Sequence, residues 1–347
     1  MTEATVLAPS EAFARQTVPF RRELLAHCYQ MLGSVHDAED LVQETMLRAW
    51  RAYDRFDGQR ASMRTWLHRI ATNACLNALD SRKRRPLPSG LGAPNEDPLA
   101  PMALDREMPW LEPIPDALLG ARTAAATDID PAAVVLARGR LRLAVIAAMQ
   151  HLPARQRAIL ILRDVLEWPA SDVAKSLDTT VVAVNSALQR ARAKLAELGV
   201  GEDQIGEPDQ AEQRALVDRY VQAFVAADLT TLAGLLAEDV VLEMPPVLNW
   251  YTGREHYVRF IARSFEIRGT DWRMVPAAAN GQPAVAAYVR AEKSKAGGDS
   301  ATGDYELHSV QLFSVGKSGV TRLTVYVDPS AFEAFDLPAR LPAADLA

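Results

Sequence analysis

The fold of the N-terminal part of the chain is decided by the stretch Asp37-Ala38-Glu39-Asp40-Leu41-Val42-Gln43-Glu44-Thr45-Met46-Leu47-Arg48-Ala49-Trp50. Apolar residues recur through it at helical spacing, which predicts a helix with one buried face. These are Leu41, Val42, Thr45, Leu47 and Trp50. Asp37 is expected to cap the helix, and acids in the first turn suit the positive end of its dipole. Asp40, Gln43 and Glu44 then share an exposed acidic face, which on an anonymous helix is usually only a solvated surface.

Length and composition set the broad class. The chain has 347 residues, which suits two or three domains. It contains no apolar run of membrane-spanning length and no signal-peptide pattern, so a cytoplasmic protein is expected. Cys28 and Cys75 lack metal-ligand spacing and are expected to be buried thiols. No metal and no cofactor is expected.

Charge is unevenly distributed around a net value of −6. Residues 1–85 carry a net charge of +3 and residues 151–200 carry +2, whereas residues 201–347 carry −8. The two basic blocks permit contact with nucleic acid, and the acidic C-terminal block does not favour it.

The first 85 residues predict helices at 13–31, 37–56 and 63–82, with Gly33 ending the first. Asparagine is a poor residue inside a helix, so Asn73 and Asn77 are either surface residues or amides that contact base edges. Capture of unpaired bases also needs cations for phosphates and aromatic rings for stacking. Residues of these kinds nearby are Phe56, Arg64, Trp66, His68, Arg82, Lys83 and Arg84.

Residues 86–130 are predicted to be an extended tether, because eight prolines fall between positions 86 and 115. Within the tether, Trp110, Leu111 and Pro113 belong to a stretch that is too apolar to remain in solvent. We expect this stretch to dock on another surface, either as a regulatory contact or as a plug with only a packing role.

Residues 131–200 predict four helices, at 132–150, 154–165, 169–177 and 181–198. The last two are separated by a turn of three residues, which is the spacing of a helix-turn-helix motif. A helical hairpin without a DNA function fits the pattern equally well. The positions expected to be buried are Val173, Ala174, Leu177, Val184 and Leu188.

These patterns resemble extracytoplasmic-function (ECF) sigma factors. Residues 10–85 resemble their region 2, and the stretch from Asp37 to Thr45 is similar to the helix that binds core RNA polymerase. The resemblance implies that Asp40, Gln43 and Glu44 contact the beta-prime clamp. It also implies that the amides, cations and rings named above read the minus-ten promoter element, although His68 replaces a more usual aromatic residue.

Residues 131–200 resemble region 4 of the same family, beginning at Leu152-Pro153-x-x-Gln156-Arg157. The resemblance implies that the last helix enters the major groove at the minus-thirty-five element. Many relatives carry arginine at the positions of Asn185 and Ala187, so a different preferred sequence or weaker readout is expected. The Trp110 stretch resembles the linker motif of members with a fused C-terminal domain. The implied reading residues are Asn185, Ser186, Gln189, Arg190 and Arg192.

Residues 211–335 predict helices followed by antiparallel strands, with a hairpin at Asn280-Gly281. The run from Pro245 to Arg254 resembles SnoaL-like domains of the cone-shaped NTF2 superfamily, which includes polyketide cyclases. Six residues could line a pocket in such a cone, although each is more often a packing residue. They are Glu243, Trp250, Tyr251, Tyr288, His308 and Tyr326. Spacing alone yields no acid–base pair.

The predicted fold class is therefore multidomain, with two all-α sigma domains followed by an α+β SnoaL-like domain. The leading interpretation is an alternative sigma factor that catalyses no reaction of its own and binds polymerase and promoter DNA. Its SnoaL-like domain is expected to modulate it by contacting region 2 or the linker. One alternative is a SnoaL-type cyclase, isomerase or hydrolase with a DNA-binding appendage. The other is a plain helix-turn-helix repressor, which leaves residues 37–50 unexplained.

Overall fold

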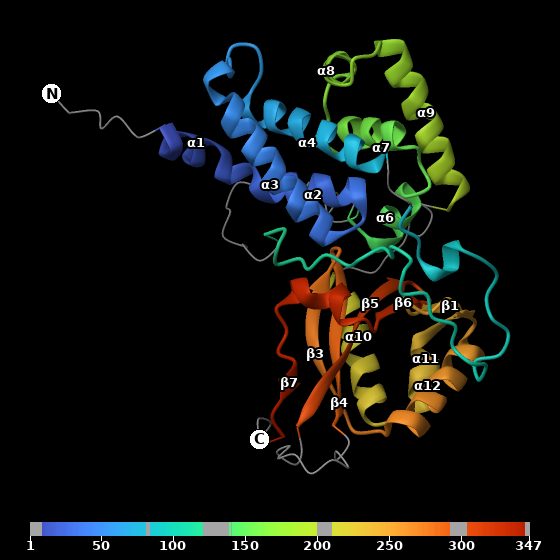
Figure 1. The fold of residues 1–347 in the computed structure, drawn as a ribbon. Helices are drawn as coiled ribbons and strands as arrows, with labels where there is room; N and C mark the ends of the chain where they lie inside the picture. Colours follow the sequence, from blue (N-terminus) through green and yellow to red (C-terminus); the bar gives the residue numbers. More distant parts are fainter. Residues whose placement is uncertain are drawn as a thin grey trace. The chain divides into compact units, whose positions relative to one another are not determined.

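The computed structural model describes residues 9–80, 84–120, 139, 141–199, 210–291 and 304–343. The chain forms two compact units, each considered separately below (Figure 1). Unit 1 contains residues 1–85 and 116–200, and unit 2 contains residues 86–115 and 201–347. Within the described residues, no helix is both long and apolar enough to cross a membrane.

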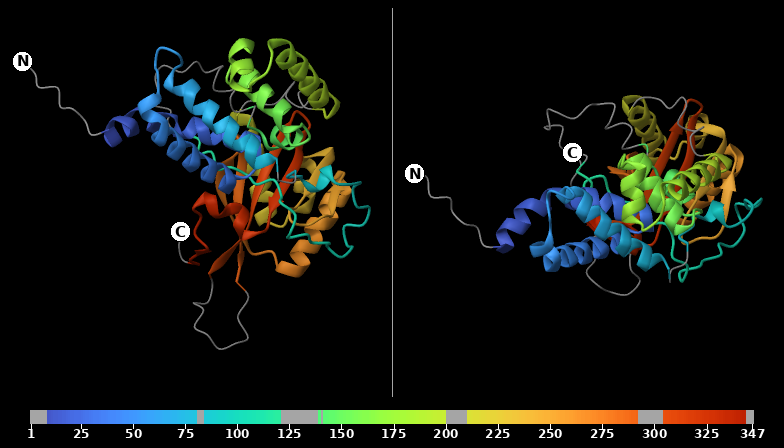
Figure 2. Two further views of the ribbon diagram at one scale, coloured as in Figure 1. Left: turned by 45° about the horizontal axis from the view of Figure 1, so that its top comes forward. Right: turned by 90° about the horizontal axis from the view of Figure 1, so that it is seen from above.

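The first part of unit 1 is built from helices that pack side by side, shown in blue in Figure 2. The predicted helix at 13–31 is broken, because Pro19 has no amide hydrogen to continue it and falls in a 3-10 turn. Gly33 ends the second helix in the left-handed conformation, as predicted. The elements are α1 (Pro9–Thr17), η1 (Val18–Phe20), α2 (Arg21–Leu32), α3 (Val35–Ala52), η2 (Tyr53–Arg55) and α4 (Met63–Leu79).

The second part of unit 1 contains the predicted helix-turn-helix. All five positions predicted to be buried are buried, and the Thr180 hydroxyl caps the last helix by accepting from the Ala183 amide. The predicted helix at 132–150 lies largely outside the described residues, and its described part is α6 (Leu143–Met149). It is followed by α7 (Ala154–Leu160), the π-turn η4 (Ile161–Val165), α8 (Ala170–Ser176) and α9 (Val181–Glu197).

Arg157 joins the two parts of unit 1. Its guanidinium is buried and donates to the Met31 carbonyl at the end of α2, and to Gln150 and Leu152. Burial lowers the pKa of Arg157 to about 10, so the group remains charged near neutral pH. Cys28 and Cys75 are both buried and unbridged, as predicted.

Unit 2 is an α+β domain, as predicted. Three helices pack against one face of a curved sheet, whose strand order is β2-β1-β6-β5-β4-β3 with β7 beside β5 (Figure 1). Among the described strands, β1 and β6 pair in parallel and the other pairs are antiparallel. The helices are α10 (Gln210–Val225), α11 (Leu229–Leu235) and α12 (Arg254–Arg268). The strands are β1 (Leu236–Glu243), β2 (Trp250–Thr252), β3 (Trp272–Ala279), β4 (Gln282–Arg290), β5 (Tyr305–Gly316), β6 (Gly319–Tyr326) and β7 (Arg340–Leu341).

The sequence missed β2 and β7, which are too short to show an alternating pattern. The predicted hairpin is present, with Asn280 and Gly281 both at positive φ between β3 and β4. A 3-10 segment, η5 (Pro329–Phe335), leads to β7, and a shorter one, η3 (Pro88–Gly90), lies near the start of unit 2.

Candidate functional site

The N-terminus of α3 differs from the prediction that Asp37 caps it. Gly33 turns the chain so that Ser34 takes an extended conformation, and the Ser34 hydroxyl accepts from the Asp37 amide at 3.2 Å. The Asp37 carboxylate instead accepts from Arg85 at 2.7 Å. Arg85 thereby ties the chain after α4 to the first turn of α3.

The outer face of α3 carries the predicted polymerase-binding residues. Asp40 and Gln43 are exposed, and the half-buried Glu44 accepts from Arg48 one turn later. Leu47 and Trp50 were predicted to face inward, but they are 48% and 40% exposed. Trp50 nevertheless packs edge-on against Phe13 of α1, with ring centroids 5.3 Å apart. The outward stripe of α3 therefore consists of Asp40, Gln43, Glu44 and Leu47.

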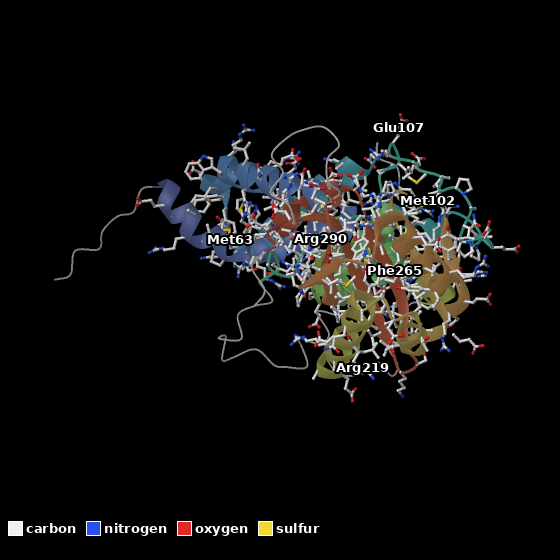
Figure 3. All side chains as sticks on the ribbon, turned by 90° about the horizontal axis from the view of Figure 1, so that it is seen from below. Met63, Met102, Glu107, Arg219, Phe265 and Arg290 are labelled. Atoms are coloured by element: carbon white, nitrogen blue, oxygen red, sulfur yellow. The ribbon has the colours of Figure 1, made fainter. Side chains whose placement is uncertain are left out.

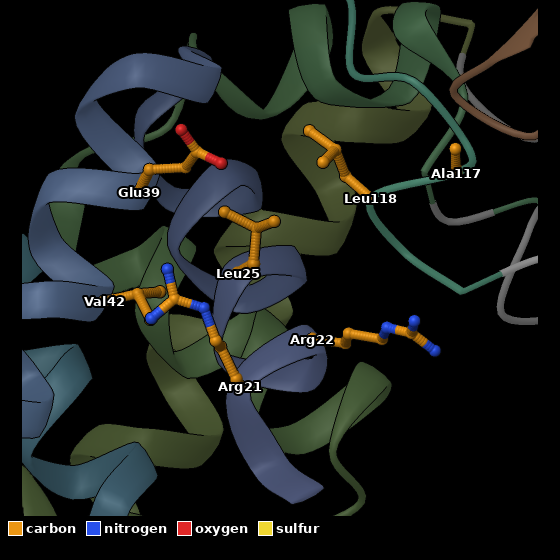
Figure 4. Close-up of a pocket in the computed structure, with 7 residues that line it drawn as sticks. All are labelled: Arg21, Arg22, Leu25, Glu39, Val42, Ala117 and Leu118. Carbon is orange, nitrogen blue, oxygen red and sulfur yellow. The ribbon is translucent and has the colours of Figure 1, made fainter. Parts of the chain in front are cut away.

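The opposite flank of α3 borders a cavity of about 220 Å³ that lies within unit 1 (Figure 4). Leu25 lies between Val42 and Leu118 in this view, with arginines from α2 at the rim. The exposed face of α3 that carries Asp40 and Gln43 and this cavity lie on different sides of the helix, because Glu39 lines the cavity whereas Asp40 is exposed.

The reading face predicted on α4 is only partly assembled. Asn73 and Asn77 are exposed, and the rings of Phe56 and Trp66 contact each other with centroids 4.9 Å apart. Arg84 donates to the His151 ring at 2.9 Å. Arg82 and Lys83 lie outside the described residues.

His68 does not belong to this face, which corrects the prediction. Its side chain has no exposed surface, and its Nδ1 bonds to the Arg64 carbonyl at 2.9 Å. Its ring packs edge-on against His27 and Trp168. Burial lowers the pKa of His68. A neutral imidazole is therefore held inside unit 1, where no nucleobase of DNA can reach it.

Arg64 lies at the margin of the same cluster. Its Nε donates to the Glu23 carboxylate at 2.7 Å, and this hydrogen bond raises the pKa of Arg64. A phosphate would therefore compete with Glu23 for Arg64.

The predicted reading residues of α9 lie together on its outer side. Asn185, Gln189 and Arg190 are exposed, and Ser186 is half-buried. Ala187 is buried, so this position does not belong to the exposed reading face. Arg192 is already paired, since it donates to both oxygens of Asp164 at 3.0 and 2.7 Å.

Residues 86–115, here called the strap, are packed onto unit 2, in contrast to the expected extended tether. The strap runs past β1 and α12 and shares isolated β-bridges with the domain, Leu104 with Val247 and Pro115 with Ala279 (Figure 1). Arg263 of α12 donates to two strap carbonyls at 2.9 and 3.0 Å. Some strap side chains still face solvent, as Glu107 does (Figure 3).

The apolar stretch at the end of the strap docks at the β3–β4 hairpin. Leu111 and Ile114 have no exposed surface, Pro113 is buried and Trp110 is half-buried. Asn280 accepts from the Ile114 amide through its side chain at 3.0 Å and donates its own amide to the Ile114 carbonyl at 2.9 Å. Sequence reasoning identified Asn280 only as a turn residue, because nothing local shows what its side chain receives.

The six pocket candidates do not converge. Tyr251 belongs to the core beneath the helices, and the His308 ring packs on Trp272 of that core. The other candidates occupy the opposite sheet face, since neighbouring residues of a strand point to opposite sides. They are Glu243, Trp250, Tyr288 and Tyr326.

On this second face the polar groups serve the strap and the C-terminal segment. Glu243 has no exposed surface and accepts from Arg322 at 2.7 Å, from Thr324 at 3.2 Å and from the Ser89 amide of the strap at 3.2 Å. Trp250 donates to the strap carbonyl of Gly92 at 3.1 Å.

Two more groups show that the candidates make no acid–base pair. The Tyr288 hydroxyl donates to the Pro338 carbonyl at 3.0 Å, in the segment that leads to β7. On the helix side of the sheet, burial lowers the pKa of His308 to about 4. Glu243 and His308, the carboxylate and the imidazole among the candidates, lie on opposite faces of the sheet and so cannot act on one substrate atom as a pair.

Comparisons with known proteins fit this arrangement. Residues 19–85 match the family Sigma-70 region 2, residues 142–195 match Sigma-70, region 4, and residues 217–328 match the SnoaL-like domain. The ECF RNA polymerase sigma factor SigG of Mycobacterium tuberculosis is 45% identical over 334 residues, which cover 95% of this chain and 85% of SigG. SigJ of the same organism is 30% identical over 249 residues, covering 70% and 69%. The SigJ crystal structure shares the fold, with a TM-score of 0.60 at 23% identity over 95% of this chain and 100% of that chain.

Proposed function

Because the chain belongs to the ECF sigma factors of RNA polymerase and carries a SnoaL-like C-terminal domain, we propose that it binds core polymerase through the outer face of α3. One observation carries this proposal. Asp40 and Gln43 are exposed on a helix whose other face is buried, and the half-buried Glu44 beside them pairs with Arg48 of the same helix. Charged and amide groups displayed in this way fit a basic partner surface.

We propose that α4 and α9 read the two promoter elements. The exposed amides of Asn73 and Asn77 suit base edges, and the Phe56–Trp66 pair offers an aromatic surface for an unstacked base. Arg64 would contact a phosphate only after leaving Glu23. On α9, Arg190 is the cation suited to the backbone, because Asp164 holds Arg192 and Glu197 accepts from Lys194 at 2.9 Å.

We propose that the SnoaL-like domain regulates by holding the strap, which joins region 2 to region 4 in sequence. About 30 residues are fixed on unit 2 when the strap is docked. A released strap could extend to about 100 Å, whereas a docked strap cannot lengthen. Docking would therefore limit how far the two DNA-reading regions separate. Catalysis by this domain is not favoured, since Glu243 is already occupied by Arg322 and the strap.

The experiment measures binding of the full chain to purified core RNA polymerase. The test variant changes Asp40, Gln43 and Glu44 to alanine together. The matched control changes Asp218, Gln222 and Glu266, which are the same residue types and are exposed on unit 2. We expect at least a tenfold weaker affinity for the test variant alone. Equal affinity for both variants would exclude α3 as the polymerase contact.

A further inference from the structure

The first half of α9 presents an uncharged surface. Residues 181–189 contain no Asp, Glu, Lys or Arg, and the first cation of the helix is Arg190. Val182 is 75% exposed, the highest value for a large apolar side chain among the described residues. A β-branched residue has no advantage in the first turn of an exposed helix, so its presence there is not explained by helix propensity.

Val182 shares a face with the amides of α9. Asn185 and Ser186 lie one turn further along, and Gln189 lies two turns along, at the spacing that places residues on one side of a helix. The other side is buried against the rest of unit 1. Val182 therefore contributes nothing to the core, and its methyl groups stand in line with the side chains proposed to read DNA.

Each of these groups has a preferred partner in the major groove. Asn and Gln amides match the N6 and N7 atoms of adenine, whereas apolar groups contact the 5-methyl group of thymine. Guanine is most often read by Arg or Lys, and this half of the helix has neither. Arg192 does not replace them, because both oxygens of Asp164 hold its guanidinium.

We propose that α9 selects an A·T-rich minus-thirty-five element, in which Val182 contacts a thymine methyl group. This inference rests on the proposed placement of α9 in the major groove. It adds the class of base pair that is read and a specificity-determining residue, Val182, which is not among the reading residues implied by the family resemblance. Arg190 would hold the backbone and leave the choice of base to the first half of the helix.

The first measurement uses holoenzyme formed from the full chain and core RNA polymerase. It is incubated with duplexes that share a fixed minus-ten region and carry six randomised base pairs around position minus thirty-five, and the bound DNA is sequenced. We expect A·T pairs to be enriched. Enrichment of G·C pairs would overturn the inference while leaving promoter reading by α9 intact. Absence of any enrichment would instead contradict the proposed reading by α9 itself.

The second measurement isolates the methyl contact on the best duplex selected. Each thymine is replaced in turn by deoxyuridine, which keeps the base pair and removes only the methyl group. We expect one replacement to weaken binding about threefold to fourfold, the value of one buried methyl group. In holoenzyme that carries Val182→Ala, the same replacement should not weaken DNA binding. Alanine favours the helix, so this substitution should leave α9 folded. It should retain its effect on the control Val225→Ala, an exposed valine of unit 2.

Two results would exclude Val182 as the contact. One is a deoxyuridine effect of equal size in wild type and Val182→Ala. The other is the lack of any position at which removing the methyl group matters.

Discussion

At the scale of single residues, Glu243 shows how a buried carboxylate is used in unit 2. It has no exposed surface, and its oxygens accept from Arg322, Thr324 and the Ser89 amide. Removing one member of a buried ion pair leaves the other without compensation, which is costly. The cost is reduced here because the Arg322 side chain is 30% exposed and can be hydrated.

We predict that Glu243→Gln lowers the free energy of unfolding of unit 2 by about 1–3 kcal/mol. It should also increase hydrogen exchange at the Ser89 amide. Urea titration and exchange measured by mass spectrometry test the two effects. Glu238→Gln, on the exposed side of the same strand, serves as the control and should change neither. A variant as stable as wild type would show that the carboxylate does not hold the strap.

His27 gives a prediction about pH. It is buried beside His68, and burial first, then the charge of His68, lowers the pKa of His27 to about 3. In the unfolded chain its pKa is about 6.5, so between these values the unfolded state binds more protons. His27 therefore does not reduce the free energy of unfolding above pH 6.5, and it reduces that free energy progressively as the pH falls below this value.

We expect the free energy of unfolding of unit 1 to fall by about 1.4 kcal/mol for each pH unit below about 6, from His27 alone. Urea titrations of wild type and His27→Gln at pH 7 and pH 5 measure it. The two proteins differ only at position 27, so the difference between their pH dependences isolates the contribution of His27. An identical pH dependence in the two proteins would contradict the assignment.

At the scale of elements, the β3–β4 hairpin does more than reverse the chain. Asn280 has a φ of 56°, which asparagine and glycine tolerate better than other residues. Its side-chain oxygen accepts from the Ile114 amide at 3.0 Å. One residue thus forms the hairpin and holds the end of the strap.

Asn280→Gly separates these two roles, because glycine keeps the turn and removes the side-chain acceptor. We predict that this variant costs about 1 kcal/mol of stability, the usual net value of a hydrogen bond, and increases hydrogen exchange at Ile114. Gly281 remains to support the turn. If exchange at Ile114 is unchanged in the variant, the buried Leu111 and Ile114 side chains, rather than Asn280, hold the strap.

At the scale of the whole molecule, the order of the two units along the chain matters. The chain leaves unit 1 after residue 85, contributes the strap to unit 2 and returns to unit 1 at residue 116. The strap lies between the two DNA-reading regions in sequence, but it is held in place by a domain that begins about 100 residues later in the chain. Removal of that domain should unfold the strap without unfolding the helices of unit 1.

A truncation ending at Gly199 tests this. We expect trypsin to cut it readily at Arg106, within the strap, whereas the full chain should be cut at that site at least tenfold more slowly. Circular dichroism should show that the helices of the truncated protein remain. Equal cleavage rates in the two proteins would mean that unit 2 does not protect the strap.

The sequence alone determined most of the local structure. Apolar spacing placed α3, α4 and α9 within a few residues of their observed bounds, and Asn280-Gly281 located the hairpin. These features depend on residues close together in the chain, so periodicity and turn chemistry reveal them. The residue stretches that resemble sigma factors are local in the same sense, which is why the family could be predicted.

Tertiary structure alone decided which side chains are available for function. His68 is buried because His27 and Trp168 pack on it, and Arg192 is paired because Asp164 lies within reach. Glu243 meets Ser89 from 154 positions away. No pattern along the chain encodes such pairings, because the free energy of burying a charge or an imidazole depends on which distant groups the fold brings beside it.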